Sequence, residues 1–171
     1  MKTILLMRHA KSSWSQSGVE DHDRILNARG REAAEKMGIW LRTRSLIPDH
    51  VLVSTAARAA ETWDRMAATH PPDLRPEFHK SLYHSGPDTM LELIKASPPT
   101  AKTLLLIAHQ PGMSAMTARM ADGQQGPDQT RAFSHFPTAG IAVLRADAPD
   151  WANIEFGGCR FETFAVPREI A

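Results

Sequence analysis

The sequence predicts an α/β protein, a three-layer sandwich in which a mostly parallel central sheet is flanked by helices. Three short apolar runs, at residues 3–7, 50–54 and 103–108, support this fold class, because apolar runs without alternation are typical of strands covered on both faces. A segment rich in helix-forming residues follows the second and third runs closely, as βα units require. With 171 residues, the chain is expected to form a single domain over residues 1–171.

The first apolar run leads directly into Arg8 and His9. Neighbouring side chains of a regular strand point to opposite faces, so both can serve one site only if the strand ends at about residue 7 and the chain then turns. A polar loop is expected over residues 15–23. We interpret residues 21–24 as a solvated turn at the end of this loop.

Helix-capping residues follow the loop and the second strand. Asn27 is predicted to cap a helix that continues through residue 30 to about residue 44. Ser54 or Thr55 is the expected N-cap of a second helix. The elements expected after it are, in order, an irregular connection at residues 70–80, a helix from about residue 85 to the prolines at 98 and 99, the third strand, a helix at 113–120, a polar loop at 122–130, and an antiparallel pair of final strands at 138–144 and 152–156.

Arg58 falls in the first turn of the second predicted helix. Free backbone N–H groups and the helix dipole already favour an anion there, so a cation is unfavourable unless an anion or a carboxylate lies nearby. Arg58 is therefore a candidate anion-binding residue. The alternative is an exposed arginine paired with Glu61 or Asp64.

The three predicted strands end at Arg8-His9, shortly before Arg58, and at His109. The carboxyl ends of parallel strands lie at one edge of a sheet, so these side chains are expected to meet in one crevice. Two arginine forks and a second imidazole around a nucleophilic histidine make a coherent phosphate pocket. The pattern indicates phosphoryl transfer through a phosphohistidine at His9.

With these residues in this order, the sequence resembles the histidine phosphatase superfamily, and within it the SixA-like phosphohistidine phosphatases. The resemblance rests on five ordered blocks: Arg8-His9-Ala10-Lys11-Ser12, with Ala where most members have Gly, and residues 21–30, 54–62, 106–112 and 136–140. It implies a phosphoglycerate mutase-like fold and activity without a cofactor or a metal.

The resemblance also assigns roles. His9 would become phosphorylated, while Arg8, Arg58 and His109 would bind and stabilise the transferring phosphoryl group. Ser12 or Lys11 would add a contact from the loop. Arg24 would either approach the rim of the pocket or form a structural salt bridge within the Asp-rich loop.

The sequence departs from the larger phosphoglycerate mutases of the same superfamily in its proton donor. The resemblance would place a glutamate that donates the proton between the second arginine and the second histidine, but no recognisable block of that kind is present here. Glu77 and Asp88 are the remaining candidates. A labile phosphoramidate needs less help at its leaving group than an ester does. Phosphohistidine in proteins is therefore the expected substrate; the alternatives are small metabolite phosphate esters or a phosphate-binding regulator without turnover. A metal site built from His79, His84 and His135 is disfavoured, because their spacing matches no ligand motif.

Composition limits the other classes of function. Twenty basic residues face 19 acidic ones, which argues against a nucleic-acid partner. The single cysteine, Cys159, excludes an internal disulfide framework. No apolar run has the length of a signal peptide's core or a membrane span, so we expect a cytoplasmic protein, without membrane contact and monomeric.

Overall fold

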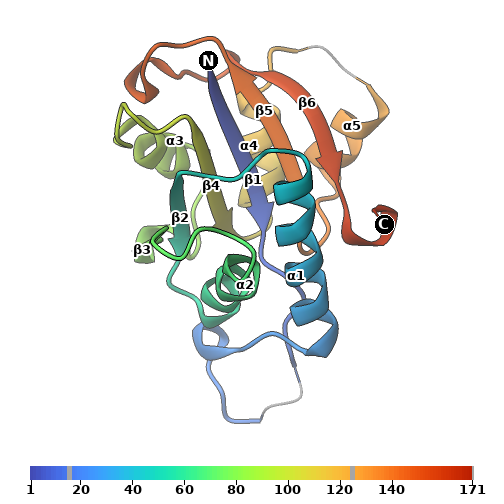
Figure 1. The fold of residues 1–171 in the computed structure, drawn as a ribbon. Helices are drawn as coiled ribbons and strands as arrows, with labels where there is room; N and C mark the ends of the chain where they lie inside the picture. The colour runs from blue at the N-terminus through green and yellow to red at the C-terminus, as the bar shows by residue number, and fades with distance from the viewer. Residues whose placement is uncertain (15–16, 124–125, 171) are drawn as a thin grey trace.

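The computed structural model describes residues 1–14, 17–123 and 126–170, so parts of both predicted polar loops, residues 15–16 and 124–125, lie outside the described residues. Its strands form one mixed sheet in the order β3-β2-β4-β1-β5-β6 (Figure 1). The strands are β1 (Lys2–Arg8), β2 (His50–Ser54), β3 (Glu77–His79), β4 (Thr103–Ala108), β5 (Ile141–Ala146) and β6 (Arg160–Ala165).

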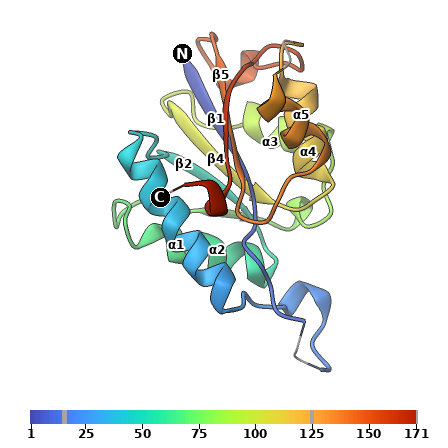
Figure 2. The same ribbon diagram turned by 90° about the vertical axis from the view of Figure 1, so that its right-hand side faces the viewer.

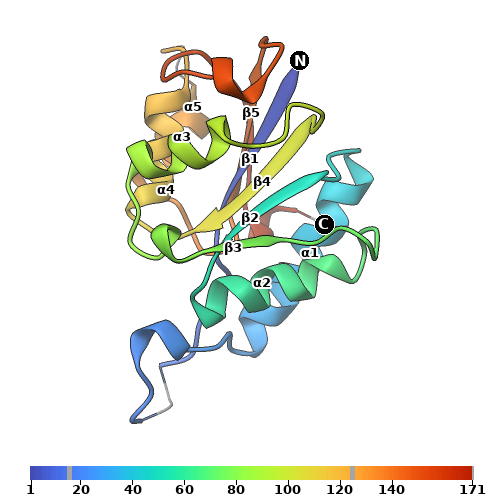
Figure 3. The same ribbon diagram turned by 90° about the vertical axis from the view of Figure 1, so that its left-hand side faces the viewer.

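The first four strands run parallel, as Figure 3 shows from the side of β3. Leu5 is paired with Leu105 of β4 and with Val143 of β5, which runs antiparallel to β1. β6 is antiparallel to β5 and closes the C-terminal edge. The mostly parallel sheet with an antiparallel C-terminal edge is therefore confirmed.

Helices cover both faces of the sheet. They are α1 (Ala28–Thr43), α2 (Ala57–Ala67), α3 (Pro87–Lys95), α4 (Gly112–Met120) and α5 (Pro127–Ser134). Figure 2 shows α1 and α2 on one face and α3, α4 and α5 on the other. Because successive side chains of a strand alternate, Leu5 and Met7 pack under α1 and α2, while Ile4 and Leu6 pack on the opposite face. Both faces are buried, which explains the unbroken apolar runs.

The predicted strand at residues 152–156 is wrong. A short 3-10 helix, Trp151–Asn153, occupies its start, and the final strand begins only at Arg160. Trp151 is fully buried and its indole N–H donates to the carbonyl of Ala101 at 2.9 Å. Ile154 is also buried in the core, so the alternating apolar pattern reflects an anchored turn and not a strand.

Smaller corrections concern the type and the capping of individual elements. Residues 77–79 were expected to belong to an irregular connection, but they form the three-residue edge strand β3. Its Phe78 is exposed, so the sequence lacks the apolar run that is typical of a buried strand. α5 occupies the second part of the polar loop expected at residues 122–130. The N-cap of α2 is Ala56 and neither Ser54 nor Thr55, although the Ser54 hydroxyl accepts from the Ala56 N–H at 3.2 Å. Asn27 caps α1 as predicted, accepting from the Gly30 N–H at 2.8 Å.

Two glycines let backbone segments approach closely beside the carboxyl edge of the sheet. A Cβ on Gly30 of α1 would lie 2.1 Å from the carbonyl oxygen of Lys11, and one on Gly112 of α4 would lie 2.3 Å from that of Ser85. These contacts fix the loop after β1 against α1 and the start of α4 against the segment before α3. Within the described residues, no helix combines the length and apolar character needed to cross a bilayer.

Candidate active site

Arg8 and His9 stand where β1 ends and the chain leaves the sheet. The strand continues one residue beyond the predicted end, through Arg8. The His9 N–H donates to the carbonyl of Ala108 at 3.1 Å, and the Ala10 N–H donates to the Thr62 hydroxyl at 2.9 Å. The backbone is thus held between β4 and α2, and this turn lets both side chains serve one cavity.

The His9 imidazole is buried and its two nitrogens have different partners. Nδ1 lies 2.7 Å from the carbonyl oxygen of Ala10, so Nδ1 carries the proton and donates it. Nε2 then has the lone pair, and the Nε–H of Arg58 points to it across 3.4 Å. Burial, followed by the charges of Arg58 and Arg8, lowers the pKa of His9 to about 3. The ring is neutral and its Nε2 is available at neutral pH.

Arg58 lies in the first turn of α2, as predicted, and is 5% exposed. Its partner is Asp21: one guanidinium nitrogen donates to the Asp21 carbonyl at 2.7 Å and the other lies 3.1 Å from the carboxylate. The alternative of an exposed arginine paired with Glu61 or Asp64 is therefore wrong. Glu61 instead accepts from the Leu26 N–H at 2.9 Å and pairs with Arg31.

His109 follows β4 and its ring centroid lies 5.1 Å from that of His9. Its Nε2 is 2.8 Å from the Ser54 hydroxyl at the end of β2, whereas its buried Nδ1 has no partner among the described residues. Burial, together with neighbouring His9 and Arg58, lowers the pKa of His109 to about 3. Arg8 donates to the carbonyl of Phe136 at 3.0 Å, and its buried Nε also has no partner there. Buried polar atoms are usually hydrogen-bonded, so these two unpaired atoms on residues that line the cavity are candidates for contacts with a ligand.

Residues 21–24 are exposed at Asp21 and Asp23, as expected of a solvated turn, but they also contact the site. Asp21 begins a short 3-10 helix, Asp21–Asp23, and its carboxylate meets Arg58, Arg24 and the hydroxyl of Tyr83. The Tyr83 hydrogen bond, with Arg24 and Arg58 beside it, holds the pKa of the Asp21 carboxyl well below its usual range. Asp21 is therefore an anion that orients the arginines. No local pattern distinguishes it from a turn aspartate, because Tyr83 is 62 residues away.

Arg24 fulfils both expectations. It forms a salt bridge with Asp21 at 3.0 Å and also lines the cavity beside His9. It donates to the Ser12 hydroxyl, and its guanidinium lies 3.6 Å from the centre of the exposed Trp14 ring.

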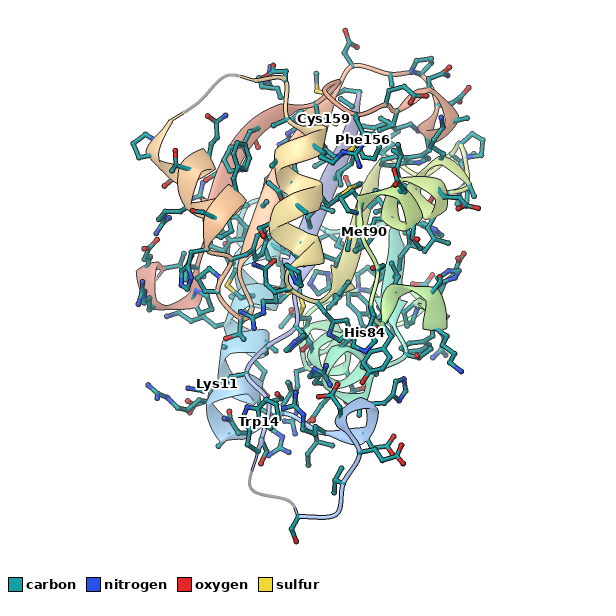
Figure 4. The ribbon with its side chains drawn as sticks, turned by 180° about the vertical axis from the view of Figure 1, so that it is seen from behind. Lys11, Trp14, His84, Met90, Phe156 and Cys159 are labelled. Atoms are coloured by element: carbon teal, nitrogen blue, oxygen red, sulfur yellow. The ribbon has the colours of Figure 1, made fainter. Side chains whose placement is uncertain are left out.

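The cavity has a volume of about 310 Å³. All six residues expected to form the site belong to its wall, which consists of Arg8, His9, Lys11, Ser12, Trp14, Arg24, Arg58, His84, His109, Gln110 and Thr138. Lys11 and His84 lie on opposite sides of this region in Figure 4, with Trp14 at the edge near Lys11. His84 was expected to be an incidental surface histidine; it is exposed but belongs to the cavity wall.

Neither carboxylate considered as a proton donor lies in this wall. Glu77 sits on β3 and contacts His79 at 3.0 Å, and Asp88 is exposed on α3, 3.5 Å from Arg119. The structure therefore brings neither carboxylate to the cavity. In the described part of the chain, no three His, Cys, Asp or Glu residues are grouped so as to hold a metal ion.

The chain is similar to known proteins both in sequence and in fold. Residues 4–83 match the family model described as the histidine phosphatase superfamily, branch 1. An uncharacterised protein of Mycobacterium tuberculosis is 38% identical over 95% of this chain and 100% of its own length. A solved protein of Nakamurella multipartitia, assigned as a phosphohistidine phosphatase SixA, is 29% identical with a TM-score of 0.85 over 97% of this chain and 96% of its own. A solved protein of Agrobacterium tumefaciens with the same assignment is 30% identical, with a TM-score of 0.78 over 97% of this chain and 98% of its own.

Proposed function

This chain belongs to the histidine phosphatase superfamily, and we propose that it is a metal-independent phosphatase acting through a phosphohistidine intermediate on His9. The observation that carries the proposal is the state of the His9 ring: Nδ1 is bound to the Ala10 carbonyl, and Nε2 is unprotonated beside Arg58. A neutral imidazole with one nitrogen held by an acceptor is a competent nucleophile.

The reaction proceeds in two displacements. His9 Nε2 attacks phosphorus, a P–N bond forms, and the bond from phosphorus to the substrate's leaving atom breaks with the electron pair going to that atom. Water then attacks the phosphohistidine, which releases inorganic phosphate and restores neutral His9. Each step passes through a transition state whose charge is spread over three phosphoryl oxygens.

Arg8, Arg58 and His109 stabilise that charge. The unpaired Nε of Arg8 and the remaining N–H groups of Arg58 supply donors next to His9. When the Ser54 hydroxyl donates to Nε2 of His109, the proton of this ring lies on Nδ1 and becomes a further donor. Lys11 and Ser12 add contacts from the loop after β1. Donors fixed before the reaction stabilise the transition state without reorganisation.

We propose phosphohistidine in proteins as the substrate. The described wall of the cavity contains arginines, histidines and a lysine but no carboxyl group that could protonate an ester oxygen. When the ring of a phosphohistidine is protonated, its leaving group is a neutral imidazole, so cleavage of the P–N bond requires no strong acid. The likeness to two proteins assigned as phosphohistidine phosphatases supports the same choice.

One side chain favours the alternative of small phosphate esters. His84 lines the cavity, and imidazole is the side chain that most readily donates a proton near neutral pH. If His84 serves as the acid, His84→Ala should lower kcat for an alkyl phosphate by about 10²-fold and leave the phosphohistidine rate nearly unchanged. An unchanged kcat for the alkyl phosphate in this variant would remove the support for ester hydrolysis.

Phosphate release by the chelator-treated protein tests the proposal. A phosphohistidine peptide is compared with an aryl phosphate, and His9→Ala serves as the control. We expect the peptide to be preferred, activity to be lost in the variant, and the wild-type protein to form an acid-labile phosphoenzyme. Preference for the ester would favour the alternative substrate class. Release from neither would favour a phosphate-binding regulator.

A further inference from the structure

A second cavity of about 330 Å³ adjoins the candidate active site. Lys11 and Thr138 belong to the walls of both cavities, so the two are continuous along the surface. The second one lies between the start of α1 and the C-terminal segment after β6, and its wall consists of Lys11, Arg29, Ala33, His135, Pro137, Thr138, Val166, Pro167 and Arg168.

The second cavity is strongly basic. Lys11, Arg29 and Arg168 carry positive charges at its exposed wall, His135 adds an imidazole, and none of the described lining residues carries a carboxylate. Lys11 and Arg29 form no ion pair within the described ranges. The first turn of α1 contains Arg29 and no acidic residue, so the positive end of the helix dipole adds to the same potential.

Two nearby carboxylates are paired with other arginines. Glu169, next to Arg168, pairs with Arg131 of α5, and Glu61 pairs with Arg31. The C-terminal segment is also fixed in place, because Lys36 of α1 donates to the Pro167 carbonyl at 2.8 Å. The cations therefore surround a defined space. Within the described ranges none of Lys11, Arg29 and Arg168 forms an ion pair, and the one carboxylate that acts on Arg168, Glu169, is paired with Arg131.

The opposite side of the active site has a different character. A third cavity there shares His84, His109 and Gln110 with the catalytic one, and no residue with the basic one. Its wall includes Pro87, Pro111 and Ala115 and carries no Lys, Arg, Asp or Glu. A chain segment lying across the active site would thus meet cations on one side and an uncharged surface on the other.

We propose that the basic cavity, formed by Lys11, Arg29, His135 and Arg168, binds acidic side chains that flank the phosphohistidine of a protein substrate. The inference rests on the proposed function and deepens it, because it specifies the sequence class of the substrate. An extended segment can place its phosphorylated residue at His9 and its neighbouring carboxylates over the cations a few residues away. A simple aryl phosphate is too small to reach them.

The test compares phosphohistidine peptides that carry aspartate on one side of the modified residue with peptides that carry asparagine there. Both the N-terminal and the C-terminal side are tried, and an aryl phosphate reports the catalytic centre alone. We expect kcat/KM to be up to about fivefold higher for aspartate on one of the two sides. The preference should shrink as salt is raised, because exposed charges are screened.

The variant Arg29→Glu/Arg168→Glu should abolish this preference and leave aryl phosphate turnover unchanged. Arg75→Glu is the control, since Arg75 is also exposed and forms no ion pair among the residues that the structure describes, but lies in the connection before β3 and outside the wall of the basic cavity. It should retain the preference. Equal rates for aspartate and asparagine peptides in the wild-type protein would overturn the inference while the proposed function stands.

Failure of the proposed function gives a distinct result. In that case neither peptide is hydrolysed although the aryl phosphate is, and the unphosphorylated peptides are then used as inhibitors of aryl phosphate turnover. Stronger inhibition by the aspartate peptide, lost in Arg29→Glu/Arg168→Glu, would support the basic cavity as a carboxylate site. Equal inhibition by both peptides would overturn it.

Discussion

His9 and His109 lie at strand ends with 6% and 8% of their surface exposed, whereas Asp21 and Tyr83, which meet beside Arg58, belong to partly exposed segments. The first pair is held by backbone bonds to neighbouring strands and by Ser54. The second pair is held by side-chain contacts between segments distant in sequence. The sheet edge therefore provides the reacting groups, and the loops adjust the direction and charge of the arginines around them.

The largest expected effect is at the sheet edge. His9→Ala removes the attacking nitrogen, so turnover should fall on the order of 10⁴-fold or more while the fold is retained. Release of phosphate from the aryl substrate and trapping of the phosphoenzyme both measure it. Substantial activity in this variant would place the nucleophile outside the sheet edge.

Arg58→Ala comes next, because Arg58 connects the two regions through His9 and Asp21. Loss of a preorganised charge-stabilising donor should lower kcat by about 10²–10³-fold. Arg58→Lys should recover little of this, since an ammonium cannot span both partners as the guanidinium fork does. Full recovery by lysine would show that charge alone is required. Arg31→Ala is the control, because it removes an arginine that is paired with Glu61 and not with Asp21, and it should leave kcat nearly unchanged.

Burial of the neutral His9 ring predicts a pH dependence that requires no substrate. Its pKa is about 3 in the folded protein and about 6.5 in the unfolded chain, so the unfolded state binds the extra proton as pH falls below 6.5. Stability is therefore lost between pH 6.5 and 3, and the loss at pH 5 should reach about 2 kcal/mol for this residue. Urea unfolding of the wild-type protein and His9→Gln at pH 7 and 5 measures it. Equal losses in both would show that His9 is not buried as a neutral ring.

The same contrast explains what could be predicted from the sequence. Arg8, His9, Arg58 and His109 follow strand-to-helix junctions, and parallel strands bring such junctions to one edge whatever the loops do. The approach of Asp21 to Tyr83 depends on how two loops cross, which no local pattern encodes. His84 was overlooked for the same reason.

The error in the last strand has a related cause. Residues 152–156 alternate as a strand would, yet the buried Trp151 holds them in a turn through Ala101, about 50 residues earlier in the chain. Local periodicity reports which side chains are buried, and it does not distinguish a strand from a turn when a distant contact fixes the backbone.

The smallest expected effect lies in the loops and tests whether they adjust the site as described. Asp21→Asn keeps the shape of the side chain and removes its charge, so Arg58 is held less firmly while the cavity becomes more positive. We expect kcat to fall about tenfold, which is the order of magnitude for a weakened charge-assisted hydrogen bond. Inorganic phosphate should inhibit the variant at least as strongly as the wild-type protein.

Asp23→Asn is the matched control, because Asp23 belongs to the same short helix but has 70% of its side chain exposed and contacts only His22 among the described ion pairs. It should leave both quantities unchanged. If Asp21→Asn instead weakened phosphate inhibition at constant kcat, the loop would contribute to binding the ground state and not to the orientation of Arg58. The division between reacting groups at the sheet edge and orienting groups in the loops would then need to be redrawn, with Asp21 placed among the residues that shape the phosphate pocket itself.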